Sequence, residues 1–210
     1  MRKVNVVIDI ETVPAELTEA QKKRYIDAYE PDARLKDPEK IKEHKEKYMR
    51  GALDKYKFRM DGCRPISAAL GIIHKGDVSG IESKFSEDSS DIAPFIANYL
   101  NEVGEFELVG FNLKRFDLPI IAKATALAGV EWKTKLGKWT IKDLCEWPLN
   151  NTYKLKDACL AFGIEIPEVS GEEVEGMFQS GKHKEIEHYN REDVRITGEL
   201  FVALSRIYAL

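Results

Sequence analysis

The feature that most constrains the fold is a short β-branched run near the N-terminus. Residues 3–10 (KVNVVIDI) are mostly apolar, which predicts a buried strand. Asp9 and Glu11 interrupt the apolar pattern two positions apart, so both carboxylates lie on one face of that strand. Two anions on a core strand repel each other and are costly to desolvate unless cations pair with them. The alternative is that this end of the strand is exposed and both acids are solvated.

The downstream patterns predict an α/β domain with a mixed central sheet. Strands are expected at 66–74 and 78–86, joined by a Gly-Asp turn into an antiparallel pair, and again at 106–112. The expected helices lie near 18–29, 38–58, 92–102 (capped by Ser90-Asp91), 116–129 (ended by Gly129), 154–162, 171–180 and 183–208. This order favours a sheet that is antiparallel in its first half and flanked by helices.

Composition narrows the class of protein. Hydrophobic residues make up 43% of the 210, enough to fill the core of one domain. No apolar run reaches the roughly 18 residues of a membrane span, and the two early acids argue against a signal peptide. Three widely spaced cysteines, Cys63, Cys145 and Cys159, indicate buried reduced thiols, not disulfides or zinc ligands. We therefore expect a cytoplasmic protein without membrane contact.

Residues 15–62 form a charged helical insertion after the first strand. Over 22–64 there are 14 Lys and Arg against 9 Asp and Glu, a net charge of +5, whereas the rest of the chain carries −9. A locally basic segment can bind a polyanion, because binding depends on the local field. We expect either an arm that guides a nucleic-acid strand toward a site beside Glu11, or a solvated helical hairpin that packs on the body or mediates oligomerisation.

Two further acids lie where the surrounding pattern is apolar. Asp117 begins a helix after the strand at 106–112, where Asp is also a good N-terminal cap. Asp193 lies four residues after Tyr189 on the last helix, so the phenol and the carboxylate share a face. The alternative for Asp193 is a surface acid among neighbouring glutamates. Clustered carboxylates are the ligands that Mg²⁺ and Mn²⁺ prefer, and the four acids together predict a site for two divalent cations.

Three segments, in order, resemble the exonuclease motifs of the DEDD-superfamily 3′–5′ exonucleases, in their tyrosine-bearing (DEDDy) branch. They are VIDIETVP (7–14), VGFNLKRFDLPII (109–121) and YNREDVRIT (189–197). The likeness is strongest to the proofreading exonuclease domain of family B DNA polymerases and its stand-alone relatives, and KLKDACLAFGI (154–164) resembles that family's connecting helix. The resemblance covers most of 1–12 and 64–210. It implies a ribonuclease H-like fold and a single 3′–5′ exonuclease domain over 1–210.

The resemblance also implies a role for each matching residue. Asp9 is expected to bridge both cations, and Glu11 and Asp193 to complete the site of the ion beside the nucleophile. Asp117 would hold the second ion. Tyr189 would orient the attacking water, since a phenol with a reference pKa near 10 is a poor base at neutral pH. Substrate contacts are expected from Thr12, Asn112 and Phe116, where a turn-forming Asn and a core aromatic are the alternatives for the last two.

Two features leave alternatives open. His188 precedes Asp193 with the spacing of the histidine-bearing branch, but adjacent helical residues point about 100° apart, so only one of His188 and Tyr189 can face the cations. The family-B-like motif FNLKRFDLP favours the tyrosine. Basic and aromatic residues also alternate in the region 131–142, which suits either single-strand binding or a hairpin with its Trp rings against the core. These residues are Trp132, Lys133, Lys135, Lys138, Trp139 and Lys142.

We therefore expect a metal-dependent 3′–5′ exonuclease that hydrolyses single-stranded or frayed DNA from its 3′ end by a two-metal mechanism. One alternative is an RNA-trimming 3′–5′ exoribonuclease, because these motifs do not report on the 2′-hydroxyl. Another is a catalytically silent nucleic-acid-binding or polymerase-accessory module. The expected partners are single-stranded nucleic acid and a polymerase or another replication or repair protein.

Overall fold

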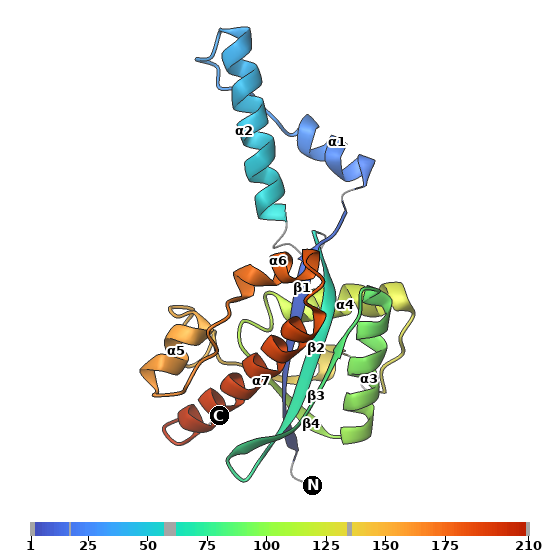
Figure 1. Cartoon of the computed structure of the whole chain (residues 1–210), viewed down its shortest axis with the longest axis vertical. Coiled ribbons are helices and arrows are strands. Elements are labelled where there is room, and N and C mark those ends of the chain that lie inside the picture. Colours follow the sequence, from blue (N-terminus) through green and yellow to red (C-terminus); the bar gives the residue numbers. More distant parts are fainter. Residues whose placement is uncertain (1–2, 17, 57–61, 134–135, 209–210) are drawn as a thin grey trace. The chain divides into compact units, whose positions relative to one another are not determined.

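A mixed five-stranded sheet forms the centre of the fold (Figure 1). The computed structural model describes residues 3–16, 18–56, 62–133 and 136–208. The strands are β1 (Val4–Pro14), β2 (Cys63–His74), β3 (Asp77–Phe85), β4 (Phe106–Gly110) and β5 (Thr140–Asp143), in the spatial order β3-β2-β1-β4-β5. β4 pairs in parallel with β1 and β5, whereas β2 and β3 pair antiparallel. The prediction of a mixed α/β sheet in a ribonuclease H-like fold is confirmed.

The helices begin and end close to the predicted residues. They are α1 (Glu19–Asp27), α2 (Pro38–Tyr56), α3 (Ile92–Val103), α4 (Asp117–Ala128), α5 (Leu155–Ala161), α6 (Val174–Gln179) and α7 (His183–Ser205). Gly129 ends α4 in the left-handed conformation, with φ of 63°. Asp91 occupies the N-cap position of α3, as predicted, but its side chain makes no capping hydrogen bond. A short 3₁₀ turn precedes the helix, and Asp88 caps this turn by accepting a hydrogen bond from the Ser90 backbone amide.

α7 covers the face of the sheet that carries the odd-numbered residues of β1. Val7 belongs to one buried cluster with Val194, and Val13 belongs to another with Ile186 and Tyr189. Since strand side chains alternate between faces, positions 9 and 11 point to the same side as these two valines. The middle turns of α7 therefore lie opposite the two acids of β1.

The close approach of α7 to the sheet depends on Gly198. A Cβ atom at this position would lie 2.3 Å from a methyl group of Val78 on β3 and 3.2 Å from one of Val7 on β1. Any larger residue here would push the helix away from both strands, and with it the acid that α7 carries.

The two tryptophans of the aromatic and basic region 131–142 pack inward, whereas Lys133 and Lys138 are exposed. The rings of Trp132 and Trp139 lie 5.0 Å apart edge to face, and Trp139 contacts Phe106 of β4 at 5.4 Å between ring centres. Lys142 forms an ion pair of 2.8 Å with Glu107. The core-facing alternative therefore holds for the two tryptophans. Lys135 lies outside the described residues.

The chain divides into two compact units, one made of residues 1–13 with 64–210 and one of residues 14–63. The smaller unit contains α1 and α2, close to the two helices expected near 18–29 and 38–58. Its Tyr29 ring packs against Tyr48 and His44, at 5.3 and 5.8 Å between ring centres. Whether the chain acts as a single domain stays a prediction.

The side chains of Cys63, Cys145 and Cys159 are buried, as predicted. Among the described helices, none combines the length and the apolar character that crossing a membrane requires.

Candidate active site

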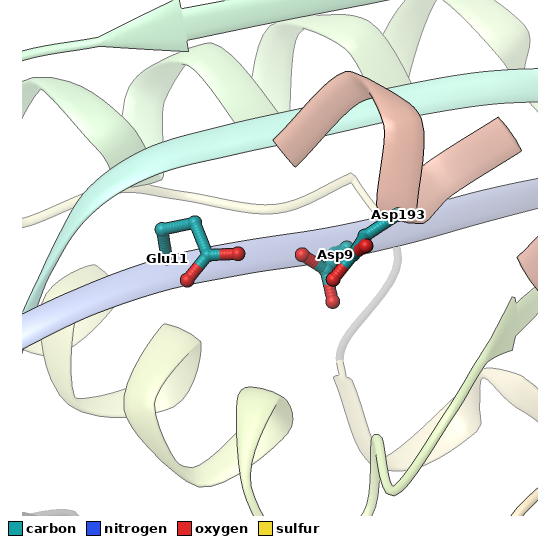
Figure 2. Close-up of side chains that lie close together, drawn as sticks. All are labelled: Asp9, Glu11 and Asp193. Carbon is teal, nitrogen blue, oxygen red and sulfur yellow. The ribbon is translucent and has the colours of Figure 1, made fainter. Parts of the chain in front are cut away.

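Three carboxylates from two distant segments meet over β1 (Figure 2). One side-chain oxygen each from Asp9, Glu11 and Asp193 lies within 4.8 Å of the others. Asp9 and Glu11 come from the same face of β1, and Asp193 comes from the turn of α7 that lies across it. Ligand oxygens around one Mg²⁺ ion are roughly 3–4 Å apart, so this cluster needs to contract only slightly to hold a cation.

Asp117 is placed beside this cluster by a different interaction. β4 ends at Gly110 while β1 continues to Pro14, so the amide of Ile10 lies beyond the parallel ladder. The Oδ1 atom of Asp117, in the first turn of α4, accepts a hydrogen bond of 3.2 Å from that amide. Phe116 occupies the N-cap position of α4, so the capping alternative for Asp117 does not hold. Among the described residues, three of the four predicted acids thus lie within mutual ligand distance, and Asp117 lies beside them.

Burial raises the pKa of all four carboxyl groups. For Asp9, desolvation is the largest cause, followed by the negative charges of Glu11, Asp117 and Asp193. Desolvation raises the pKa of Asp117 to about 8 and that of Asp193 to about 6. The pKa of Glu11 is also raised, first by burial and then by the neighbouring acids. Such mutually repelling carboxylates favour a bound cation, which removes the repulsion.

The residues present fit a divalent cation. Oδ1 of Asp193 is buried and has no hydrogen-bond partner among the described residues. Buried carboxylate oxygens normally have a partner, and a cation would supply one here. The donor set consists of carboxylate oxygens, the ligands that Mg²⁺ and Mn²⁺ prefer.

Tyr189 faces the carboxylates, and His188 does not. Tyr189 is 5% exposed, and its interaction with Asp193 lowers the pKa of that carboxyl group. Burial and the acids around it raise the pKa of the Tyr189 phenol well above its ordinary range. His188 is exposed and, like Tyr189, lines a pocket of about 550 Å³ between α7 and residues 165–169, but it is not among the described groups within mutual ligand distance. The placement agrees with the tyrosine spacing, although the assignment to that branch stays a prediction.

The three predicted substrate-contact residues follow or precede the acids along the chain. Thr12 comes directly after Glu11 on β1, and Phe116 directly before Asp117, and both are partly buried. Asn112 has φ of 59°, a left-handed conformation that Asn tolerates well, so its turn-forming role is present. A contact between these residues and a substrate stays a prediction.

Asp143, which no motif marks, fixes the loop that carries Asn112. Its Oδ1 atom accepts a hydrogen bond of 2.8 Å from the backbone amide of Asn112, and its Oδ2 atom accepts one of 2.9 Å from the backbone amide of Lys114. Asp143 is 5% exposed at the end of β5. The pairing of β5 with β4, which the sequence did not predict, brings this carboxylate to the loop.

Two residues near the cluster were missed by sequence reasoning. Asn190 donates a hydrogen bond of 2.6 Å to Asp9. Lys156 on α5 lowers the pKa of Glu11 and of Asp193 through its positive charge, and its Nζ atom lies 5.5 Å from the centre of the Tyr189 ring. The spacing of Asn190 three residues before Asp193 on one helix face was the only available signal for it. Lys156 lies within a segment that was compared only as a connecting helix.

The comparisons with known proteins bear on the fold. No family model matches the sequence, and no curated protein does. Among solved structures, the family B DNA polymerase from the hyperthermophilic archaeon Pyrobaculum calidifontis matches with a TM-score of 0.59 and 14% identity, over 99% of this chain and 24% of the polymerase. The chain shares its fold with part of this polymerase.

Two structures of exonuclease I match more weakly. One is a product-bound form, with a TM-score of 0.49, and the other is an apo form, with a TM-score of 0.47. Both are 14% identical and match over 98% of this chain, which spans 44% and 42% of theirs. The chain thus spans less than half the length of each of these three proteins.

Proposed function

We propose that this chain is a metal-dependent 3′–5′ exonuclease that acts on single-stranded or frayed DNA ends. The observation that carries the proposal is the convergence of Asp9, Glu11 and Asp193 within 4.8 Å, from segments that resemble the first and third exonuclease motifs. The acid of the second motif, Asp117, lies beside them. The fold shared with part of a family B DNA polymerase supports the same interpretation. A cytoplasmic location and a polymerase or repair partner remain predictions.

In this proposal, Asp9, Glu11 and Asp193 would hold one Mg²⁺ or Mn²⁺ ion, and Asp117, together with Asp9, would hold a second. Bound divalent ions supply charge neutralisation at the scissile phosphate and make water a better nucleophile. The carboxyl groups must lose their protons to act as ligands. Because their pKa values are raised, cation binding should release protons near neutral pH.

Tyr189 acts as an orienting group. Its phenol keeps its proton, since burial raises its pKa above the ordinary range, so it cannot serve as a base. It can hydrogen-bond a water molecule beside Asp193 and direct a lone pair of that water toward the phosphorus. Correct orientation of a reactant is the contribution expected of such a group.

A degradation assay with labelled oligonucleotides tests the proposal. Single-stranded DNA labelled at its 5′ end should shorten stepwise from the 3′ end with Mn²⁺ and stay intact with EDTA. Asp9→Ala and Asp193→Ala should reduce the rate by at least about 10³-fold while the protein stays folded. Asp77→Ala, which removes an exposed acid at the start of β3, is the matched control and should retain the wild-type rate.

Other outcomes would assign a different function. Faster shortening of RNA than of DNA would identify an exoribonuclease. Retained binding without cleavage, in either cation, would indicate a silent nucleic-acid-binding module and overturn the proposal.

A further inference from the structure

Asn190 lies at the centre of a buried polar chain that ends on Asp9. Its Nδ2 atom donates to Oδ2 of Asp9 at 2.6 Å, and the hydroxyl of Ser67 donates to its Oδ1 atom at 2.9 Å. Asn190 and Ser67 are both 0% exposed. The chain links β2, α7 and β1, so that a hydroxyl on β2 acts on a carboxylate of the cluster through one amide.

When Asp9 is ionised as a metal ligand, its charge fixes the direction of this amide. If the amide were turned over, its oxygen would face Oδ2 of Asp9 at hydrogen-bond distance, and two acceptors would repel each other. Ser67 fits this orientation by donating to the amide oxygen, but since a hydroxyl can also accept, it is Asp9 that decides the direction. Turning the Asn190 amide over would therefore break the hydrogen bond to Asp9 in a buried part of the protein, where a lost bond is costly.

A neutral donor suits this position better than a cation would. A lysine or arginine would neutralise Asp9 and compete with a metal ion for it. An amide holds one oxygen of the carboxylate in place, adds no positive charge, and leaves the second oxygen available as a ligand. A short hydrogen bond to a carboxylate is among the stronger neutral-donor interactions in proteins.

We infer that Ser67 and Asn190 are positioning residues that hold the Asp9 carboxylate in the orientation required to bind a divalent cation. The inference rests on the proposed function, because it takes the carboxylate cluster to be a metal site. Removing a hydrogen-bond partner of a metal ligand typically costs 10- to 100-fold in metal affinity or activity. The competing explanation is that the hydrogen bonds from Ser67 to Asn190 and from Asn190 to Asp9 only satisfy buried polar groups and hold α7 against the sheet. In that case its loss would lower stability and leave metal affinity unchanged.

Calorimetric titration of the whole protein with Mn²⁺ separates the two explanations. Asn190→Leu keeps the size of the side chain but removes the donor, and Ser67→Ala keeps the amide but removes its second hydrogen-bond partner. Thr197→Val is the matched control, since Thr197 is 2% exposed and lies two turns further along the same helix. We expect a loss of Mn²⁺ affinity of about 10- to 100-fold for Asn190→Leu and a smaller loss for Ser67→Ala. Thr197→Val should stay within about twofold of the wild type.

Melting in EDTA, measured on the same variants, completes the test. Wild-type Mn²⁺ affinity in a folded Asn190→Leu protein with a lower melting temperature would overturn the inference. If Asn190→Leu does not fold, Ser67→Ala decides: unchanged affinity overturns the inference, and reduced affinity with a normal Thr197→Val control supports it.

The cleavage assay distinguishes this inference from the proposed function. A wild-type protein that binds Mn²⁺ without cleaving any oligonucleotide would overturn the exonuclease proposal, while the affinities of the variants still decide the positioning role. A wild-type protein that binds no Mn²⁺ would overturn both.

Discussion

Asp117 is subject to two opposing influences on its protonation. Its hydrogen bond from the Ile10 amide favours the carboxylate, whereas desolvation favours the neutral acid and raises the pKa to about 8. An unfolded Asp has a pKa near 3.9, so the folded state binds the proton more tightly. The resulting stabilisation is fully present below about pH 4 and is lost as the pH rises through about 8.

Asp117→Asn should therefore stabilise the metal-free protein at alkaline pH. Asparagine resembles the neutral acid and keeps an oxygen that can accept the hydrogen bond from the Ile10 backbone amide. In EDTA at pH 8.5 we expect a gain of at least about 1 kcal/mol, or roughly 2–4 °C in melting temperature for a chain of this length. The gain should be smaller at pH 5, where the wild-type acid is protonated. The same gain at both pH values would show that charge at this position is not the cause.

Tyr189→Phe and His188→Ala should differ sharply in activity. Loss of the phenol removes the group that orients water but no metal ligand. We expect kcat to fall by about 10²-fold with Mn²⁺ affinity within about twofold of the wild type. His188→Ala should leave kcat nearly unchanged, since His188 is exposed and does not join the three carboxylates within ligand distance. A cleavage assay on the two variants measures these rates. A large loss of rate in His188→Ala with little loss in Tyr189→Phe would assign the protein to the histidine-bearing branch.

Some residues of the site could be recognised from the sequence and others could not, for a physical reason. An acid within an apolar strand is anomalous, so the residue pattern alone makes Asp9 and Glu11 conspicuous. Asn190 and Ser67 are small neutral residues with many ordinary uses in a buried element. Their hydrogen bond joins positions 123 residues apart, and only the packing of α7 on β2 creates it.

At the scale of elements, local patterns predicted type and extent better than pairing. The apolar runs located β1 to β4, and the left-handed Gly129 ended α4 as expected. β5 was only one alternative for its region, because a four-residue strand owes its existence to pairing with β4. Asp91 lies at the predicted N-cap position of α3 but makes no capping bond with its side chain, and the bond that is present belongs to Asp88 and the 3₁₀ turn before the helix.

The basic helix α2 carries the next prediction. Lys42 and Lys45 line one exposed stretch of this helix together with Arg50, while Tyr29 packs near Lys45. If the insertion guides single-stranded DNA, neutralising four lysines of α2 should weaken substrate binding and flatten its salt dependence. Each lost phosphate contact lowers the slope of log affinity against log salt by about 0.7 for single strands. The lysines to be replaced by glutamine are Lys40, Lys42, Lys45 and Lys47.

Fluorescence anisotropy at several salt concentrations measures this effect. Turnover at saturating substrate should change little, because the lysines are not metal ligands. Replacing the exposed Lys75 and Lys184 of the larger unit serves as the control and should leave the slope near its wild-type value. Unchanged affinity and slope in the four-lysine variant would favour the solvated-hairpin alternative for residues 15–62.

For the whole molecule, the uneven charge predicted from the sequence has a structural counterpart. The segment with a net charge of +5 falls largely in the smaller unit, and the larger unit contains the carboxylate cluster. Folding brings four acids from three segments together. Their desolvation and mutual repulsion oppose folding when they are ionised. The stability of the whole molecule should therefore depend on pH and on divalent cations together.

Mn²⁺ should raise the melting temperature more at pH 8 than at pH 5. Without metal, the raised carboxyl pKa values make the folded state lose stability as the pH rises from about 4 to 8. A cation that binds only the folded state adds about 2.7 kcal/mol at a concentration 100 times its dissociation constant, or roughly 5–10 °C here. At pH 5 protons compete for the same oxygens, so the gain shrinks. Scanning fluorimetry gives the four melting temperatures, with Mn²⁺ or EDTA at each pH. The Asp9→Ala/Asp193→Ala double variant should show little gain at either pH. An equal gain in that variant would place the stabilising cation elsewhere on the protein.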